Sequence, residues 1–195
     1  IEQSMPFYKN LTLEEGLDSL FIGMVETMIA AIEAKDIYTI GHSERVCEYS
    51  LVIADKLGLE SDTKKYLMIS ALCHDIGKIG IPDAILKKTS ALTHDEYQEM
   101  KLHPLIGAGI VASLPNSSRF VSGVKYHHEK WDGTGYPEGL EGESIPFFAR
   151  VIAVADAFDA MVSGRSYAGF MDESDAIKRI QEESDLFDPQ IVKAL

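Results

Sequence analysis

The run from His74 to Lys78, His-Asp-Ile-Gly-Lys, is the stretch of this sequence whose side chains are best suited to chemistry. An imidazole nitrogen and a carboxylate oxygen on adjacent residues can bind the same metal centre, and a carboxylate can bridge two ions. Lys78 adds a fixed positive charge three residues after Asp75. The alternative is that His74 and Asp75 form only the polar end of a helix, which Gly77 caps. The rest of the chain decides between these interpretations.

Other histidines occur in similar polar motifs, which favours the metal interpretation. Asp156 stands in an otherwise apolar run, where we expect it to be buried and to bind metal, with a structural hydrogen bond as the alternative. His94 lies inside a capping box from Thr93 to Glu96, so we expect it to be exposed and outside the site. Five imidazoles and two carboxylates remain as candidate metal ligands: His42, His74, Asp75, His103, His127, His128 and Asp156.

The composition restricts the partners of the chain. It has 195 residues and a net charge of −13, and this negative field argues against binding to polymeric nucleic acid or anionic lipid. A phosphate-bearing substrate would have to be attracted locally, by metal ions or by a few cations. The fractions of hydrophobic and charged residues, 46% and 25%, are those of an ordinary globular domain.

No signal peptide is recognisable, and the most apolar early stretch, Leu20 to Ile32, contains Glu26 and is too short to cross a bilayer. We therefore expect a cytoplasmic protein without membrane insertion. Cys47 and Cys73 lie within helical patterns and have no CxxC partner, so we interpret them as structural thiols rather than as ligands or a disulfide. Because the sequence begins with Ile1, we expect a fragment of a longer protein.

The first predicted helix starts at a capping box from Thr12 to Glu15. Its apolar residues recur at a spacing close to 3.5, which predicts a core-facing stripe, with a dimerising signalling helix as the alternative. These residues are Leu17, Phe21, Met24, Met28 and Ala31. We divide the chain into 1–35, an N-terminal helix that could link to an upstream sensor domain, and 36–195, the main domain.

The remaining pattern is helical, without the alternation typical of strands, so we predict an all-α fold. Further helices are predicted over 42–58, 61–72, 82–86, 93–103, 105–113, 117–128, 147–162 and 173–183, with a last one that begins at 188–189. A long glycine-punctuated loop follows His128 and continues to Pro146. Because this loop contains Trp131 and Tyr136, we expect it to be packed and functional.

Taken together, these motifs resemble those of the HD-GYP family, a bacterial branch of the HD-domain metal-dependent phosphohydrolases. The similarity covers roughly residues 36 to 192. Its pieces are Tyr-Thr-Ile-Gly-His-Ser-Glu-Arg-Val around His42, His-Asp-Ile-Gly-Lys-Ile-Gly-Ile-Pro-Asp, His-Pro at 103, His-His-Glu before Asp-Gly-Thr-Gly-Tyr-Pro, Ile-Pro and Ala-Arg between 145 and 150, and Ala-Asp-Ala-Phe-Asp-Ala ending at Ala160. The segment Gly135-Tyr136-Pro137 gives such domains the second half of their name and makes the match specific.

The resemblance implies an HD-domain helical bundle with a glycine-rich loop near a di-metal site. The implied activity is hydrolysis of cyclic di-GMP to linear pGpG, with GMP as a second candidate product. The family analogy places His42, His74, Asp75 and Asp156 around one ion, and His103, His127 and His128 around the other, with Asp75 as the bridge. The ions implied are iron or manganese, with zinc or nickel as alternatives.

The resemblance also assigns roles around the ions. Asp75 and Lys78 are the expected catalytic residues, since Lys78 would bind a phosphate oxygen or assist the leaving oxygen. Lys78, Tyr136 and Arg165 are the expected substrate-binding residues. Some relatives carry a glutamate four residues before the first histidine, which recruits a third metal. Tyr38 occupies that position here, so we predict two ions.

A second departure leaves other functions open. Relatives usually continue with basic residues after Tyr167, whereas this chain has Ala168 and Gly169, and this loss of charge would weaken substrate binding. One alternative is therefore a weakly active or inactive domain that binds nucleotides, or binds partner proteins through the Tyr-Pro loop. Another is an enzyme for a different cyclic dinucleotide or a nucleotide phosphate. We also expect that the chain could form a homodimer through its N-terminal helix.

Overall fold

The structure is a computed structural model that describes residues 17–35, 40–164 and 170–195. Within these residues every regular element is a helix, and β pairing is confined to an isolated bridge between Asp132 and Glu141. The predicted all-α class is therefore confirmed. The elements are α1 (Leu17–Glu33), α2 (His42–Lys56), α3 (Ser61–Leu72), η3 (Ile76–Gly80), α4 (Asp83–Leu86), α5 (His94–Met100), α6 (His103–Val111), η4 (Ser117–Arg119), α7 (Val121–Tyr126), η5 (Gly142–Ser144), α8 (Phe147–Val162), α9 (Glu173–Glu182) and α10 (Pro189–Ala194).

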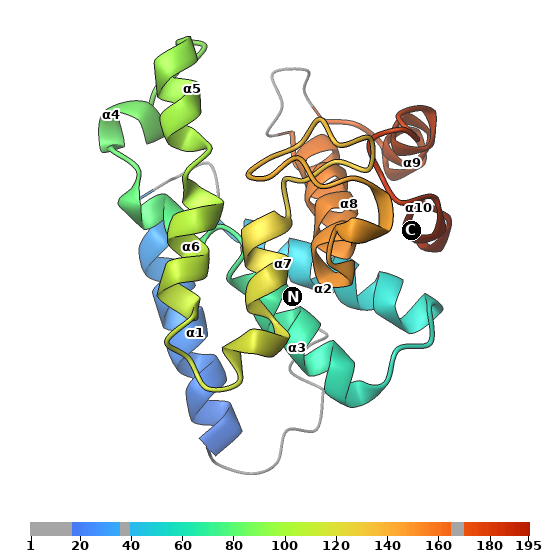
Figure 1. Cartoon of the computed structure of the whole chain (residues 1–195), viewed down its shortest axis with the longest axis horizontal. Coiled ribbons are helices and arrows are strands. Elements are labelled where there is room, and N and C mark those ends of the chain that lie inside the picture. The colour runs from blue at the N-terminus through green and yellow to red at the C-terminus, as the bar shows by residue number, and fades with distance from the viewer. Residues whose placement is uncertain (1–16, 36–39, 165–169) are drawn as a thin grey trace, which may run out of the picture.

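The centre of the bundle is formed by α2, α3, α7 and α8, which pack against one another (Figure 1). Helix α8 begins and ends at the predicted residues. Most of its residues are apolar, so it passes through the core. Its residues Val151, Ile152, Val154 and Ala155 are completely buried. Burial of each larger aliphatic side chain stabilises the fold by about 1.5–3 kcal/mol.

A second layer carries α1, η3 and α6 along one side of this bundle (Figure 1). Beyond it, Ile81, Ile85 and Leu86 form a small separate apolar cluster under α5. The predicted capping box at the start of α5 is confirmed, because the Glu96 amide donates to Thr93 Oγ1 and the Thr93 amide donates to the Glu96 carboxylate. His94, in the first turn of α5, is exposed as expected.

The predicted buried face of α1 is wrong. Met24 and Met28 are 58% and 42% exposed, whereas Val25, Ile29 and Ile32 enter the core. Apolar residues occur all around this helix, so its spacing alone could not identify the buried side. The side chains of Leu17 and Phe21 lie outside the described part, as does the capping box predicted at 12–15.

Several predicted helix boundaries also need correction. Ser61 is the N-cap that the sequence predicts for α3, but the N-cap is Glu60 and Ser61 is the first helical residue. The helix predicted over 117–128 is two elements, η4 and α7, separated at Phe120, whose φ of −133° leaves the helical region while its side chain is completely buried. Helix α5 ends at Met100 rather than at 103. At Phe120, tertiary packing overrides the local helical pattern.

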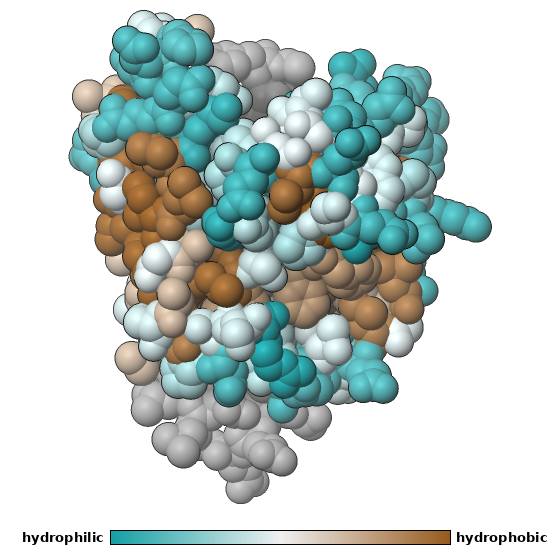
Figure 2. All heavy atoms as spheres, in the orientation of Figure 1, coloured by the Kyte–Doolittle hydropathy of each residue, from teal (hydrophilic) through white to brown (hydrophobic). Residues whose placement is uncertain are grey.

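The surface of the described residues bears on the membrane and partner contacts expected from the sequence. No helix among the residues described is long and apolar enough to span a membrane. Figure 2 shows hydrophobic side chains gathered over the region of α6, where Leu102 and Leu105 are among the large exposed hydrophobic residues. The upper part of this face is mostly polar, and smaller hydrophobic areas lie at its centre and lower right.

Gly77 of η3 packs tightly against the backbone at the start of α6. A Cβ atom at Gly77 would lie 1.9 Å from the carbonyl oxygen of His103 and 2.5 Å from the amide nitrogen of Gly107. Both contacts are with backbone atoms, so no side chain can move aside. Gly77 therefore serves this close approach and does not act as the helix cap that the polar-end interpretation required.

The Gly77→Ala variant tests this packing. We expect it to lower the free energy of unfolding by about 3 kcal/mol, because the new methyl group overpacks two backbones. The matched control is Gly109→Ala in α6, where a Cβ would meet nothing within 4 Å. This control should gain about 0.5–1 kcal/mol from the higher helix propensity of alanine. Equal urea midpoints for the two variants would contradict the packing argument.

Candidate metal centre

The seven predicted ligands come from five separate places in the chain and meet in the middle of the bundle. His42 begins α2, the pair at 74–75 follows α3, His103 begins α6, the pair at 127–128 follows α7, and Asp156 lies within α8. Their potential ligand atoms form two groups, in each of which all the atoms lie within 4.8 Å of one another. One group is His42, His74 and Asp156, and the other is Asp75, His103, His127 and His128.

Asp75 faces both groups. Its Oδ2 atom lies 3.5 Å from His74 Nε2 and 3.7 Å from His42 Nε2, whereas its Oδ1 atom lies 3.3 Å from His103 Nε2. One carboxylate oxygen is therefore directed to each group. This arrangement would allow Asp75 to bridge two ions, which is the role that the resemblance implies.

The spacing within each group fits a shared ion. The Nε2 atoms of His42 and His74 are 3.2 Å apart, and those of His103 and His127 are 3.4 Å apart. Asp156 Oδ1 lies 3.3 Å from His42 Nε2. Two ligands bound at about 2.1 Å to one ion are about 3.0–3.4 Å apart for octahedral to tetrahedral angles. The donor set of neutral imidazoles and carboxylates suits divalent transition metals.

The ends of helices orient three of the imidazoles. Nδ1 of His74, His103 and His127 lies 2.7–2.8 Å from a backbone carbonyl oxygen three residues earlier, at Ala71, Met100 and Val124 respectively. Because a carbonyl can only accept, each Nδ1 carries the proton and donates. The Nε2 lone pair is then left free to bind an ion.

Burial keeps most of these imidazoles neutral, as metal binding requires. It lowers the pKa of His74 and His103, lowers the pKa of His127 well below the ordinary 6.5, and lowers the pKa of His128 to about 3. For His42, burial also acts to lower the pKa, but carboxylates on α8 outweigh it and raise the pKa.

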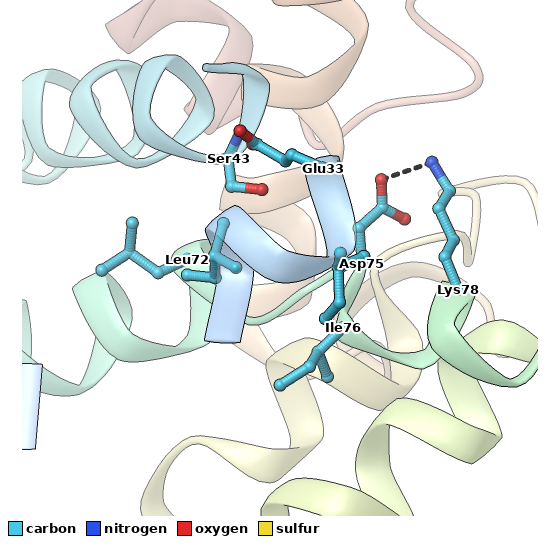
Figure 3. A pocket seen from close by; sticks show the side chains of 8 residues that line it. Glu33, Ser43, Leu72, Asp75, Ile76 and Lys78 are labelled. Atoms are coloured by element: carbon cyan, nitrogen blue, oxygen red, sulfur yellow. Dashed lines mark hydrogen bonds and ion pairs between the residues drawn. The ribbon is translucent and has the colours of Figure 1, made fainter. Parts of the chain in front are cut away.

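The carboxylates stay ionised. Burial acts to raise the pKa of Asp75, but the charge of Lys78 and the surrounding imidazoles outweigh burial and hold that pKa well below its usual range. Lys78 Nζ lies 2.6 Å from Asp75 Oδ2, as the dashed line in Figure 3 marks. Burial likewise acts to raise the pKa of Asp156, but its hydrogen bond with His42 and the nearby imidazoles lower it. Both aspartates are therefore available as anionic ligands.

The prediction that Asp156 is buried needs correction, because its side chain is 24% exposed. The completely buried carboxylate of α8 is Asp159, one turn later, which the sequence reading missed. His42 Nδ1 donates to Asp159 Oδ2 at 2.7 Å, and Arg45 donates to both oxygens of Asp159, at 2.5 and 3.1 Å. The available signal was spacing, since Asp159 and Arg45 each follow a candidate ligand by three residues.

The loop after His128 is packed, as predicted. Glu129, also missed as an individual residue, is buried and accepts hydrogen bonds from the amides of residues 138, 139 and 140 at 2.7–3.1 Å. The Tyr136 ring stacks on His128 with centroids 4.8 Å apart, and Lys101 Nζ lies 4.9 Å from the Tyr136 centroid. Tyr136 therefore contacts a candidate ligand directly.

The remaining residues discussed in the sequence analysis lie outside the two ligand groups. Arg165, like the segment at 168–169 and Tyr38, lies outside the described residues. Cys47 and Cys73 are buried and form no disulfide, which agrees with structural thiols. Glu33, at the end of α1, reaches the start of α2, where it accepts from the Ser43 amide at 3.3 Å (Figure 3).

A family model for the HD domain matches residues 26–191, so the chain belongs to the HD domain family. Its resemblance to the HD-GYP branch is confirmed by its curated relatives. The cyclic di-GMP phosphodiesterase response regulator RpfG of Xanthomonas campestris is 43% identical over 169 residues, which cover 85% of this chain and 44% of that protein. The 3'3'-cGAMP-specific phosphodiesterase 3 of Vibrio cholerae is 36% identical over 181 residues, covering 92% and 39% respectively.

The fold has close counterparts among solved structures. A cyclic GMP-AMP specific phosphodiesterase of Vibrio cholerae superposes with a TM-score of 0.66 at 24% identity, over 87% of this chain and 47% of that one. The chain spans less than half the length of the curated relatives described above.

The Asp159→Asn variant tests how the His42 imidazole is held. We expect this variant to weaken Mn²⁺ binding at one of two sites by about 10–100-fold, the usual effect of removing a partner that orients a ligand. Asp188→Asn is the matched control, because Asp188 is a buried partner of Arg150 outside both ligand groups. Titration calorimetry gives both affinities. Equal weakening at both sites, or at neither, would contradict the assigned role.

Proposed function

We propose that this chain is the catalytic domain of a metal-dependent phosphodiesterase that hydrolyses cyclic di-GMP to linear pGpG, with GMP as a second product to test for. The observation that carries the proposal is the Asp75 carboxylate, which turns one oxygen toward each of two histidine-rich groups. The names of the relatives support the substrate class. The names of both relatives contain a cyclic dinucleotide as substrate, and we propose a substrate of the same class for this chain.

The proposed cofactors are two divalent ions, iron or manganese, with zinc or nickel as alternatives. His42, His74 and Asp156 would hold one ion, and His103, His127 and His128 the other, with Asp75 shared. When bound, such a pair of ions polarises phosphoryl oxygens and lowers the pKa of water enough to supply a nucleophile at neutral pH. We propose two ions rather than three, because Tyr38 replaces the glutamate that some relatives use.

The residues of the chain contribute binding and orientation. We propose that Lys78 binds a phosphate oxygen, since its ammonium lies next to the shared carboxylate and would face a diester bound there. Tyr136 would contact the substrate from its position on the His128 ring, and Arg165 is a further candidate for phosphate contact. Local cations are needed because the chain carries a net charge of −13, which repels an anionic substrate at long range.

Two alternatives remain within this proposal. The substrate could be another cyclic dinucleotide, as the name of the Vibrio cholerae relative suggests. A weakly active or inactive domain that binds nucleotides or partner proteins is favoured by one feature of the sequence, the absence of basic residues at 168–169. The hydrolysis assay described below separates these alternatives from the leading one.

We also propose a cytoplasmic location and an upstream sensor domain, to which 1–35 would connect the domain at 36–195. In the structure, α1 packs on the core through Val25, Ile29 and Ile32. Its exposed methionines, Met24 and Met28, are the residues that a second copy of the chain would cover in a dimer.

The direct test is hydrolysis of cyclic di-GMP by the chain purified without oxygen and loaded with Fe²⁺ or Mn²⁺. We expect Asp75→Asn to lose about two orders of magnitude in turnover or more, because both ions lose their shared ligand. His94→Ala is the matched control and should retain full turnover, since His94 is exposed and outside both groups.

Chromatography of the products measures the outcome. Equal turnover by Asp75→Asn and the parent chain would rule out the assigned centre. Tight binding of cyclic di-GMP without turnover by the parent chain would instead support the binding module.

A further inference from the structure

The end of α1 lies between two segments that carry proposed metal ligands. Glu33, its last helical residue, lines one small pocket together with Ser43 at the start of α2 and with Asp75 and Lys78 (Figure 3). His42, next to Ser43, belongs to one ligand group, and Asp75 faces both groups. The end of α1 is therefore in a position to influence where His42 lies relative to Asp75.

Glu33 supplies the cap that α2 does not have of its own. The N-cap residue of α2 is Gly41, whose φ of 70° lies in the left-handed region and which has no side chain to accept from the first amides of the helix. The Glu33 carboxylate takes this role from another helix. It accepts from the Gly41 amide at 2.8 Å and from the Ser43 amide at 3.3 Å. These two hydrogen bonds hold the backbone on both sides of His42.

The backbone position of His42 matters because its side chain is buried among neighbours from other helices. Its Nδ1 atom donates to Asp159 at 2.7 Å, and its Nε2 atom lies 3.2 Å from that of His74. Asp159 belongs to α8 and His74 follows α3. A shift of the first turn of α2 alone would therefore change the distance from the His42 ring to the rest of its ligand group.

Lys35, just after α1, binds the second segment. Its ammonium donates to the carbonyl oxygens of Ile79 and Ile81, at 2.9 and 2.7 Å, and lies 3.3 Å from Asp83 Oδ1. The last carbonyl groups of a helix have no partner within it, so a lysine that donates there stabilises the helix end. Lys35 thus holds the end of η3, the element that directly follows Asp75.

We propose that Glu33 and Lys35 form a clamp at the end of α1, which sets the position of His42 relative to Asp75. Both are positioning residues, because they act through backbone groups near the ligands. The inference rests on the proposed function, since it requires the two ligand groups to bind ions. It gives α1, the helix proposed to join an upstream domain, a direct connection to the metal centre.

Titration of Glu33→Ala with Mn²⁺ is the first test. We expect the site that contains His42 to bind Mn²⁺ about tenfold more weakly, because removal of a group that orients a ligand costs about 10–100-fold. The other site should keep the parent affinity. Titration calorimetry gives both affinities, and His42→Ala identifies the step that belongs to His42. Glu33→Gln keeps one acceptor oxygen and should lose less affinity than Glu33→Ala.

The Lys35→Met variant should have a different effect, because Lys35 holds the segment of the shared carboxylate. We expect it to weaken both sites by a similar factor, since Asp75 faces both ligand groups. A purely structural role for the clamp would lower the melting temperature of the two variants and leave the ratio of the two Mn²⁺ affinities unchanged in Glu33→Ala.

Each variant has a matched control. Glu96→Ala removes a carboxylate that accepts from the Thr93 amide at the start of α5, a helix that carries none of the seven candidate ligands. Lys87→Met removes a lysine that, like Lys35, pairs with Asp83, in this case at 2.8 Å. Both controls should keep the parent Mn²⁺ affinities. Melting temperature shows whether each variant is folded.

Amide hydrogen exchange tests the clamp in the metal-free chain. Glu33→Ala should raise the exchange rates of the Gly41 and Ser43 amides by about tenfold, the factor expected for loss of a helix cap. Unchanged exchange rates at these two amides would overturn the proposal. Equal weakening of both Mn²⁺ sites in Glu33→Ala, or of neither, would also overturn it.

The failure of this inference can be distinguished from the failure of the proposed function. A chain that binds two ions and loses affinity selectively in Glu33→Ala, but does not hydrolyse cyclic di-GMP, would contradict the enzyme and support the clamp. A chain that hydrolyses cyclic di-GMP and keeps both Mn²⁺ affinities in Glu33→Ala would support the enzyme and contradict the clamp.

Discussion

The Asp75 carboxylate has to face two groups of imidazoles at once, and much of the surrounding structure serves this requirement. Asp75 lies between the end of α3 and the start of η3, so its position depends on how closely η3 can approach α6, which carries His103. Gly77 permits that approach, because any side chain there would collide with the backbone. Lys78 then balances the charge of the aspartate at 2.6 Å. The segment from Asp75 to Lys78 thus contains the shared carboxylate, the glycine that allows its placement and the lysine that balances its charge.

Hydrogen bonds give several of the imidazoles an orientation that suits metal binding. Three of them donate from Nδ1 to carbonyl oxygens at the ends of helices, which orients each ring and satisfies backbone acceptors that a helix end leaves free. His42 is oriented differently, by the buried Asp159 and its partner Arg45. Neutral buried imidazoles cost less to desolvate than charged ones, so the fold can hold close together the four whose pKa is lowered by burial. Asp75 and Asp156 stay ionised and can compensate the charge of the ions.

The sequence predicted the helical class, the bounds of α8 and all seven members of the two ligand groups, because each rests on a local pattern or a recognisable motif. It could not identify the buried face of α1, which has apolar residues on every side and is oriented only by its neighbours. It also placed Asp156 in the core, whereas the buried carboxylate is Asp159. The two residues lie on the same apolar helix, and only the positions of α2 and Arg45 determine which of them is enclosed. The roles of partners outside the ligand groups are therefore set by packing between helices.

The most direct test of the account is a titration of the metal-free chain with Mn²⁺, followed by electron paramagnetic resonance. The account predicts two ions per chain whose spins are coupled, since a shared carboxylate holds such ions about 3.5–4 Å apart. Asp75→Asn should remove the coupled signal. Uptake of a single ion, or of two ions with the spectrum of isolated Mn²⁺, would contradict the central claim that Asp75 joins the two groups into one centre.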